Sequence, residues 1–146
     1  MRVDLYFRAG RDPDLEQKVP GIDIIRLRAR IRFKTNHGWT DTFSAIVDTG
    51  APISLIPDVV WQKIQRTELA DHSVGGIGLG SLPVKVAKVC CQLLDTQGNQ
   101  GKEIEMHAFL VQAGKKAPLI IGFKDLLDRF PAYFNYPAQQ AYVEEP

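Results

Sequence analysis

The chain has 146 residues, enough for one domain that buries roughly two-thirds of its unfolded surface. Hydrophobic residues make up 45% and charged residues 24%, which is typical of a soluble globular protein and excludes a disordered one. The net charge is +1 and no apolar run reaches membrane-spanning length, so we expect neither a nucleic-acid partner nor a membrane partner.

The N-terminal region predicts one strand and a loop. Apolar and polar residues alternate from Val3 to Arg8, which indicates a short first strand, and the early charges do not resemble a signal peptide. Residues 9–21 are mostly polar and contain Pro13 and Pro20, so a loop is expected there.

The clearest strand pattern lies between Ile25 and Phe33, where apolar residues alternate with arginines. The arginines are Arg26, Arg28, Arg30 and Arg32. Such a row could bind a nucleic-acid backbone or an acidic peptide, or it could be a solvated face that keeps the sheet soluble. The near-neutral net charge and the absence of interleaved aromatic residues favour the solvated face.

A turn at 35–38 leads to a further strand at 42–47, which ends directly in Asp48. An Asp at the end of an apolar strand is costly to bury unless its charge or proton is held. Gly50 suits a tight turn that brings backbone close to another group. The pattern therefore indicates a carboxylate aimed into a turn, as acid–base chemistry requires, with an ordinary solvated Asp–Gly loop as the alternative.

The remainder predicts strands joined by short turns, with two brief helices. Strands are expected at 84–94, 104–111, 118–121, 133–137 and 141–143. Helices are expected at 58–65 and over about two turns before Pro131, while 67–73 reads as a polar linker before the glycine cluster at 75–80. Many strands and only two short helices predict an all-β domain.

Two adjacent cysteines, Cys90 and Cys91, lie in one of the expected strands. Adjacent residues of a strand point to opposite faces, so a disulfide between them would be strained. We therefore expect reduced thiols and a cytoplasmic protein.

Three features taken in order resemble the retropepsin family, the single-domain aspartic proteases of the retroviral type and their bacterial relatives. They are Asp48-Thr49-Gly50-Ala51, the glycine-rich Gly75-Gly76-Ile77-Gly78, and Leu119-Ile120-Ile121-Gly122 before a helix. The likeness covers residues 22–143. It implies an N-terminal extension or strand at 1–21 and a protease domain at 22–146, a closed β-barrel of the acid-protease half with one short C-terminal helix.

The resemblance also implies an activity. Hydrolysis of a peptide bond by this family uses two carboxyl groups that share a proton and titrate as a pair. The chain carries Asp-Thr-Gly only once, at Asp48, so the second carboxyl is expected from a second copy in a twofold homodimer. The expected enzyme is an aspartic endopeptidase that cleaves an extended peptide and needs no cofactor and no metal.

The resemblance also implies a role for each residue that matches a family motif. The expected catalytic residues are Asp48, Thr49 and Gly50, with the Thr49 hydroxyl bonded to the partner's loop. The expected substrate-binding residues are Ala51, Gly75, Gly76, Ile77, Gly78 and Ile121, of which the glycines and Ile77 would form a mobile flap. Ile121 and Gly122 are expected to pack under the active-site loop.

One position departs from the family. Many members have Asp or Asn two residues after the glycine of the third motif, but here that residue is Lys124 and the acid, Asp125, comes one later.

The sequence also raises two alternatives to the protease function. A catalytically silent dimeric peptide-binding module of the same fold remains open. A nucleotide cradle at 75–80 is disfavoured because a strand, not a helix, follows the glycines.

Overall fold

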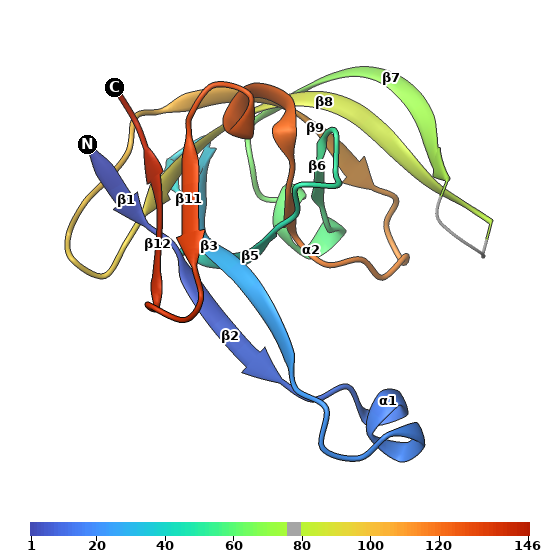
Figure 1. The fold of residues 1–146 in the computed structure, drawn as a ribbon. Coiled ribbons are helices and arrows are strands. Elements are labelled where there is room, and N and C mark those ends of the chain that lie inside the picture. Colours follow the sequence, from blue (N-terminus) through green and yellow to red (C-terminus); the bar gives the residue numbers. More distant parts are fainter. Residues whose placement is uncertain (76–79) are drawn as a thin grey trace.

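The computed structural model describes residues 1–75 and 80–146, and most of its regular structure is strand (Figure 1). In chain order the strands are β1 Arg2–Asp4, β2 Tyr6–Gly10, β3 Ile24–Thr35, β4 Gly38–Trp39, β5 Phe43–Val47, β6 Ser54–Ile56, β7 Arg66–Gly75, β8 Ser81–Leu94, β9 Ile104–Val111, β10 Ile120–Ile121, β11 Ala132–Asn135 and β12 Gln140–Glu144. The short helical segments are α1 Pro13–Lys18, α2 Asp58–Trp61 and η1 Phe123–Leu127. The expected all-β class is confirmed.

Six of the strands close into a barrel. Their hydrogen-bonded order is β3-β5-β10-β6-β9-β8, and β8 returns to pair with β3 from Arg30↔Leu94 to Phe33↔Cys91. The alternating apolar residues of β3 point into this barrel, where Ala29, Ile31 and Phe33 are fully buried. The expected closed barrel is therefore present.

The N-terminal region differs from the expected strand and loop. Its first strand is divided, because β1 pairs with β12 while β2 pairs with β3. Beyond the barrel, β2 and the start of β3 continue as a projecting arm that carries α1 at its tip (Figure 1). The loop expected over 9–21 is wrong in part, because Asp12 caps α1 by accepting hydrogen bonds from the amides of Asp14 (2.9 Å) and Leu15 (3.1 Å).

A second, three-stranded sheet joins the two ends of the chain in the order β1-β12-β11. The expected C-terminal hairpin is confirmed, since β11 and β12 are antiparallel neighbours. Val3 and Val143 pair across this sheet and are both buried. Strand β12 is the central strand, so both of its edges are occupied within one chain.

The polar linker expected at 67–73 is wrong, because this segment belongs to the long strand β7. It pairs with β8 from Arg66↔Val89 to Gly75↔Ser81, with a bulge between Glu68 and Ala70. Almost every residue of β7 is exposed, so neither face needs apolar side chains and the alternating pattern is absent. Backbone pairing with β8 makes this segment a strand although it buries almost no side chain.

The helical segments are shorter or less regular than expected. Segment α2 ends at Trp61, where the sequence indicated a helix to residue 65. The C-terminal helical segment, η1, contains two non-helical residues, Lys124 (ψ 123°) and Asp125 (φ 66°). In the described part of the chain no helix is long and apolar enough to cross a membrane.

The arginines of β3 are not the fully solvated row that the sequence favoured. Only Arg26 is exposed; Arg28, Arg30 and Arg32 are half-buried. The guanidinium of Arg30 lies 4.1 Å from the ring centre of Tyr6 in β2, and that of Arg32 lies 4.7 Å from Trp39 in β4. The aromatic cover comes from neighbouring strands, which explains why the β3 sequence did not show it.

Candidate active site

The Asp48 carboxylate is held by the turn that it begins. The Asp48 amide still belongs to the barrel, since it donates to the Ile121 carbonyl (2.9 Å). The chain then turns, and the Gly50 amide donates to Asp48 Oδ1 (2.8 Å) while the Ala51 amide donates to the Asp48 carbonyl (3.2 Å). The Gly50 amide thereby fixes the direction of the Asp48 carboxyl group relative to the loop.

The segment around β10 supports this loop from below. The amides of Phe123 and Lys124 donate to the carbonyls of Ala51 and Pro52, each at 2.9 Å. The Gly122 amide donates to the hydroxyl of Ser54, a buried residue of β6 (3.0 Å). Three consecutive amides are thereby used to fix the Asp48 loop.

Gly122 is required by close packing. A Cβ at this position would lie 2.5 Å from the Ala51 carbonyl oxygen and 3.0 Å from the Ile53 carbonyl carbon. Both are backbone atoms that cannot rotate away, so only glycine lets β10 approach the loop this closely.

The structure brings together most of the predicted site residues. Asp48, Thr49, Gly50 and Ala51 form one loop, and Ile121 lies beside it in β10 through the pairing Ile121↔Val47. Thr49 and Gly50 are exposed and Asp48 is half-buried.

The expected flap lies on another element, the β7–β8 hairpin, which extends from the barrel (Figure 1). Gly75 ends β7 opposite Ser81. The other flap residues that we expected, Gly76, Ile77 and Gly78, lie outside the described residues.

A buried carboxylate next to this site was not assigned a role from the sequence. Asp125 is 3% exposed and accepts hydrogen bonds from the His107 amide (2.9 Å), the His107 ring Nδ1 (2.7 Å) and Arg129 (2.9 Å). Burial alone would raise the pKa of Asp125, but the two bonds from His107 and the charge of Lys124 outweigh it and hold the pKa below its ordinary value.

The displaced acid was the sequence signal for this cluster. Asp125 comes one residue later than the family pattern, and the extra residue is accommodated by the left-handed backbone at Asp125 (φ 66°). The carboxylate thereby reaches His107 and links β9 to the segment that supports the Asp48 loop.

The surface around Thr49 is apolar and hollowed. One depression is lined by Leu27, Val47, Thr49, Phe123, Leu127 and Phe134, among others. A second is lined by Thr49, Ala51, Pro52 and Phe123 with Lys124 and Asp128. Phe123 and Phe134 are 42% and 58% exposed, so large apolar side chains are left uncovered beside the carboxylate.

Within residues 1–75 and 80–146 no group of three His, Cys, Asp or Glu side chains is placed to hold a metal ion. Cys90 and Cys91 are free thiols, and burial raises the pKa of the Cys91 thiol, which makes it a poor nucleophile.

A closed barrel that presents one Asp-Thr-Gly loop at the end of the barrel strand β5 defines a protein of the acid-protease type. The sequence model of the retroviral aspartyl protease family matches residues 23–134. The chain therefore belongs to the retroviral aspartyl protease family.

Individual relatives are more distant. A stretch of 77 residues is 35% identical to the Gag-related polyprotein of the mouse intracisternal A-particle MIA14; the match covers 53% of this chain but 9% of that polyprotein. Among solved structures, EIAV protease complexed with the inhibitor HBY-793 matches with a TM-score of 0.40 and 15% identity, over 66% of this chain and 81% of that one.

Proposed function

We propose that the chain is an aspartic endopeptidase that acts as a homodimer. The observation that carries the proposal is the Asp48 carboxylate, fixed by the Gly50 amide at 2.8 Å and placed beside an exposed apolar surface. Peptide hydrolysis by carboxyl groups needs two of them, and one chain contributes a single Asp-Thr-Gly loop. A second copy, related by a twofold axis near Thr49, would complete the site.

In this scheme an ionised Asp48 takes a proton from water as the water oxygen attacks the peptide carbonyl. Asp48 of the partner subunit gives its proton to the carbonyl oxygen, which forms a neutral tetrahedral intermediate. When the C–N bond breaks, the leaving amine takes the proton from Asp48, and one hydroxyl of the intermediate returns its proton to Asp48 of the partner subunit. The products are a carboxylic acid and an amine, and the carboxyl pair regains its starting state. The close pair shares one proton between steps because two carboxylates in contact do not both ionise.

Several features of the chain support a partner at this surface. Thr49 is exposed at the tip of the loop, where its hydroxyl is free to reach a neighbouring loop. The apolar side chains of Phe123 and Phe134 flank it and lie partly open to solvent. Strand β12 already has a neighbour on each side, so in this proposal the loop and these side chains form the interface and β12 is not exchanged between the two copies.

The substrate is proposed to be an extended peptide. The β7–β8 hairpin would cover it, and Ala51 and Ile120 would contact it from the floor of the cleft. Ile121, which we expected to contact substrate, is only 1% exposed and would instead support the Asp48 loop from inside the barrel. Main-chain pairing of the peptide with strand-like walls gives affinity, while pockets for alternate side chains give specificity.

The proposal is tested by comparing the wild-type protein with the variant Asp48→Asn. Incubated with a mixed peptide library at mildly acidic pH, the wild type should cleave and Asp48→Asn should not, since an amide neither takes nor gives the proton. Sedimentation velocity should show that both proteins form dimers of the same mass. Cleavage that persists in Asp48→Asn, or a wild-type protein that cleaves only as a monomer, would refute the proposal.

A catalytically silent peptide-binding dimer remains the second candidate. It is favoured by one result of the same experiment: equal binding of peptides by wild type and Asp48→Asn, without cleavage by either.

A further inference from the structure

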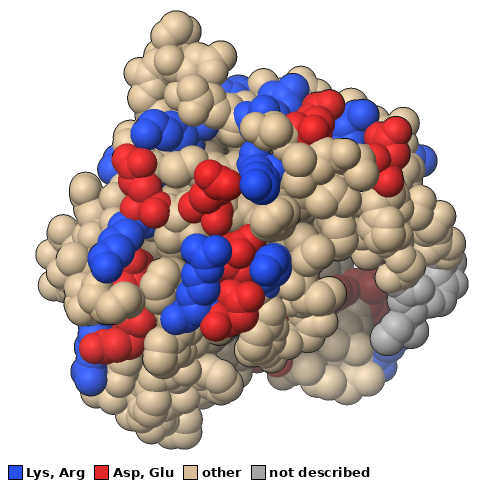
Figure 2. All heavy atoms as spheres, turned by 90° about the horizontal axis from the view of Figure 1, so that it is seen from above, with Lys and Arg blue, Asp and Glu red and all other residues tan. Residues whose placement is uncertain are grey.

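Arginines on one face of β2 and β3 have no ionic partner. Arg8, Arg26, Arg28 and Arg30 form no ion pair with a carboxylate in the described part of the chain. Several cations elsewhere are matched, as where Lys85 pairs with Asp71 at 3.0 Å, and the face in Figure 2 shows acidic and basic side chains interspersed. An unmatched cationic surface indicates an anionic ligand.

This arginine face is the face of the sheet from which Asp48 projects. Residues paired directly across antiparallel strands point to the same side, and the pairs are Arg8↔Arg26, Tyr6↔Arg28 and Arg28↔Ile46. Asp48 follows Ile46 by two residues and so shares that side, roughly 7 Å further along the strand. The register thus places the arginines and the Asp48 carboxylate on the same side of the sheet.

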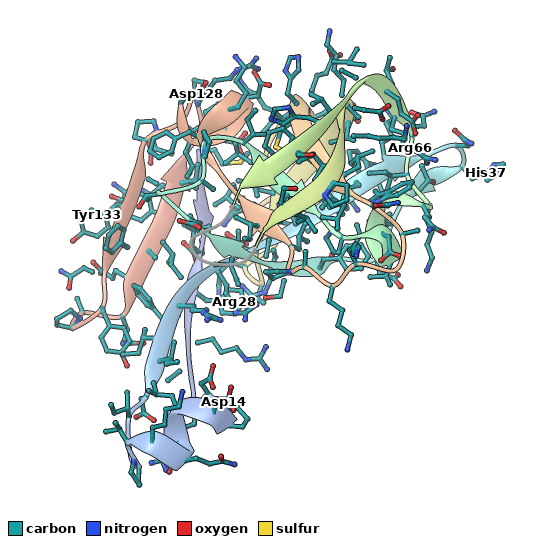
Figure 3. All side chains as sticks on the ribbon, turned by 90° about the vertical axis from the view of Figure 1, so that its right-hand side faces the viewer. Asp14, Arg28, His37, Arg66, Asp128 and Tyr133 are labelled. Atoms are coloured by element: carbon teal, nitrogen blue, oxygen red, sulfur yellow. The ribbon has the colours of Figure 1, made fainter. Side chains whose placement is uncertain are left out.

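Arg28 shows that the face is not merely solvated. Its Nε is buried and has no hydrogen-bond partner, while one terminal nitrogen donates to the Ser44 hydroxyl at 3.3 Å. In Figure 3 Arg28 lies where the arm joins the barrel, and Asp14 marks the far end of the arm. An unpaired buried donor is costly, and a bound carboxylate nearby would compensate for it.

The charged residues that line the groove at this junction are mainly cations. Arg8, Arg26 and Arg28 line it together with Arg11 and one acid, Asp12. Arg11 is already paired with Glu16 (3.1 Å), and Asp12 Oδ1 is used by the amides that cap α1. The unpaired charge of the groove is therefore positive.

We propose that Arg8, Arg26 and Arg28 bind acidic side chains of the substrate, at positions beyond the residues that flank the scissile bond. The inference rests on the proposed function. Alternate residues of an extended peptide repeat at roughly 7 Å, which is also the spacing of alternate arginines along β3. Guanidinium groups bind carboxylates with two parallel hydrogen bonds, which makes a row of arginines selective for Asp and Glu.

A nucleic-acid backbone is the other anion that such a row could bind. The net charge of +1 gives the chain little general attraction for a polyanion. The acidic peptide is favoured because the arginines adjoin a carboxylate that would act on peptide bonds.

The test measures binding to the Asp48→Asn protein, so that it does not depend on cleavage. Fluorescence anisotropy compares two extended peptides that differ only in Glu against Gln at alternate positions. The Glu peptide should bind about two- to fivefold more tightly for each carboxylate, as partly exposed ion pairs do. This preference should shrink at high ionic strength.

Variants then show which arginines cause the preference for the Glu peptide. In the Asp48→Asn background, Arg26→Gln and Arg8→Gln should reduce the Glu-to-Gln ratio, while Arg26→Lys should retain part of it. Lys63→Gln, at an exposed site outside the arm, should leave the ratio unchanged. Both target residues are exposed, so these variants should fold, and a change of ratio is not produced by a general loss of stability.

Three results overturn the inference: equal binding of the two peptides, a ratio that Arg26→Gln does not alter, or tighter binding of a single-stranded RNA that Arg26→Gln abolishes. Failure of the wild type to cleave any peptide would refute the proposed activity alone. A Glu preference that depends on Arg26 would in that case still support the arginine face.

Discussion

Replacing Gly122 with alanine tests how closely the β10 segment must approach the Asp48 loop. The added methyl group would meet the Ala51 carbonyl oxygen at 2.5 Å and the Ile53 carbonyl carbon at 3.0 Å. Since neither atom belongs to a flexible side chain, the backbone of β10 or of the loop must move.

The magnitude follows from the contacts that such a shift disturbs. Overpacking of a buried site costs about 1–3 kcal/mol. Two hydrogen bonds join the moving parts most directly, from the Gly122 amide to Ser54 (3.0 Å) and from the Phe123 amide to Ala51 (2.9 Å). Weakening them adds about 1 kcal/mol each, so we expect Gly122→Ala to lower the free energy of unfolding by about 3–5 kcal/mol.

Urea unfolding followed by the fluorescence of Trp39 and Trp61 measures this loss. The control is Gly10→Ala, where a Cβ would meet nothing within 4 Å and the expected change is within about 0.5 kcal/mol. If the variant retains enough structure to assay, kcat/KM should fall about 100-fold, because a small displacement of Asp48 misaligns the pair. Equal stability of the Gly122→Ala and Gly10→Ala proteins would refute the packing argument.

Three further outcomes are expected. Asp125→Asn should lower the free energy of unfolding by about 1.5–3 kcal/mol, because hydrogen bonds to a charged group are lost. The control Asp128→Asn, at an exposed site, should change it little, and urea titrations measure both values. The pKa of Asp125 is lowered in the folded protein, so its contribution to the free energy of unfolding is complete above the ordinary carboxyl pKa of ~4 and is lost as pH falls through the lowered pKa. The stability of Asp125→Asn should therefore decline less steeply with acid than that of the wild type. Phe123→Ala should leave the fold intact but raise the dissociation constant of the dimer at least roughly tenfold, because apolar contact area is lost at both symmetric copies of the site. An unchanged dissociation constant in sedimentation equilibrium would place the interface elsewhere. Phe33→Ala, at a fully buried site in the barrel, should cost about 3–5 kcal/mol in the same unfolding assay, and a loss below ~1 kcal/mol would contradict the assigned core.

Local patterns predicted the elements that have one buried face. The period of two along β3 placed Ile31 and Phe33 inside, and the apolar run before Asp48 placed that carboxylate at the end of a strand. These predictions succeeded because side-chain direction in a strand depends only on position along the chain.

Elements without a buried face were missed. Strand β7 is held by backbone hydrogen bonds to β8 and is exposed along almost its whole length, so its sequence resembles a linker. The short helix α1 buries no residue, and its only local signal was the Asp12 cap followed by Pro13. Hydrophobic periodicity carries no information where nothing apolar is buried.

The sequence by itself determined the β class, the Asp-Thr-Gly turn and the glycine that follows β10. Only the tertiary structure decided that β8 closes the barrel against β3, that Asp125 turns inward to His107, and that the arginines of β3 lie on the side of Asp48. The physical reason is range: strand and turn preferences act over a few neighbouring residues, whereas these contacts join segments far apart in the chain and depend on how the sheet twists and closes.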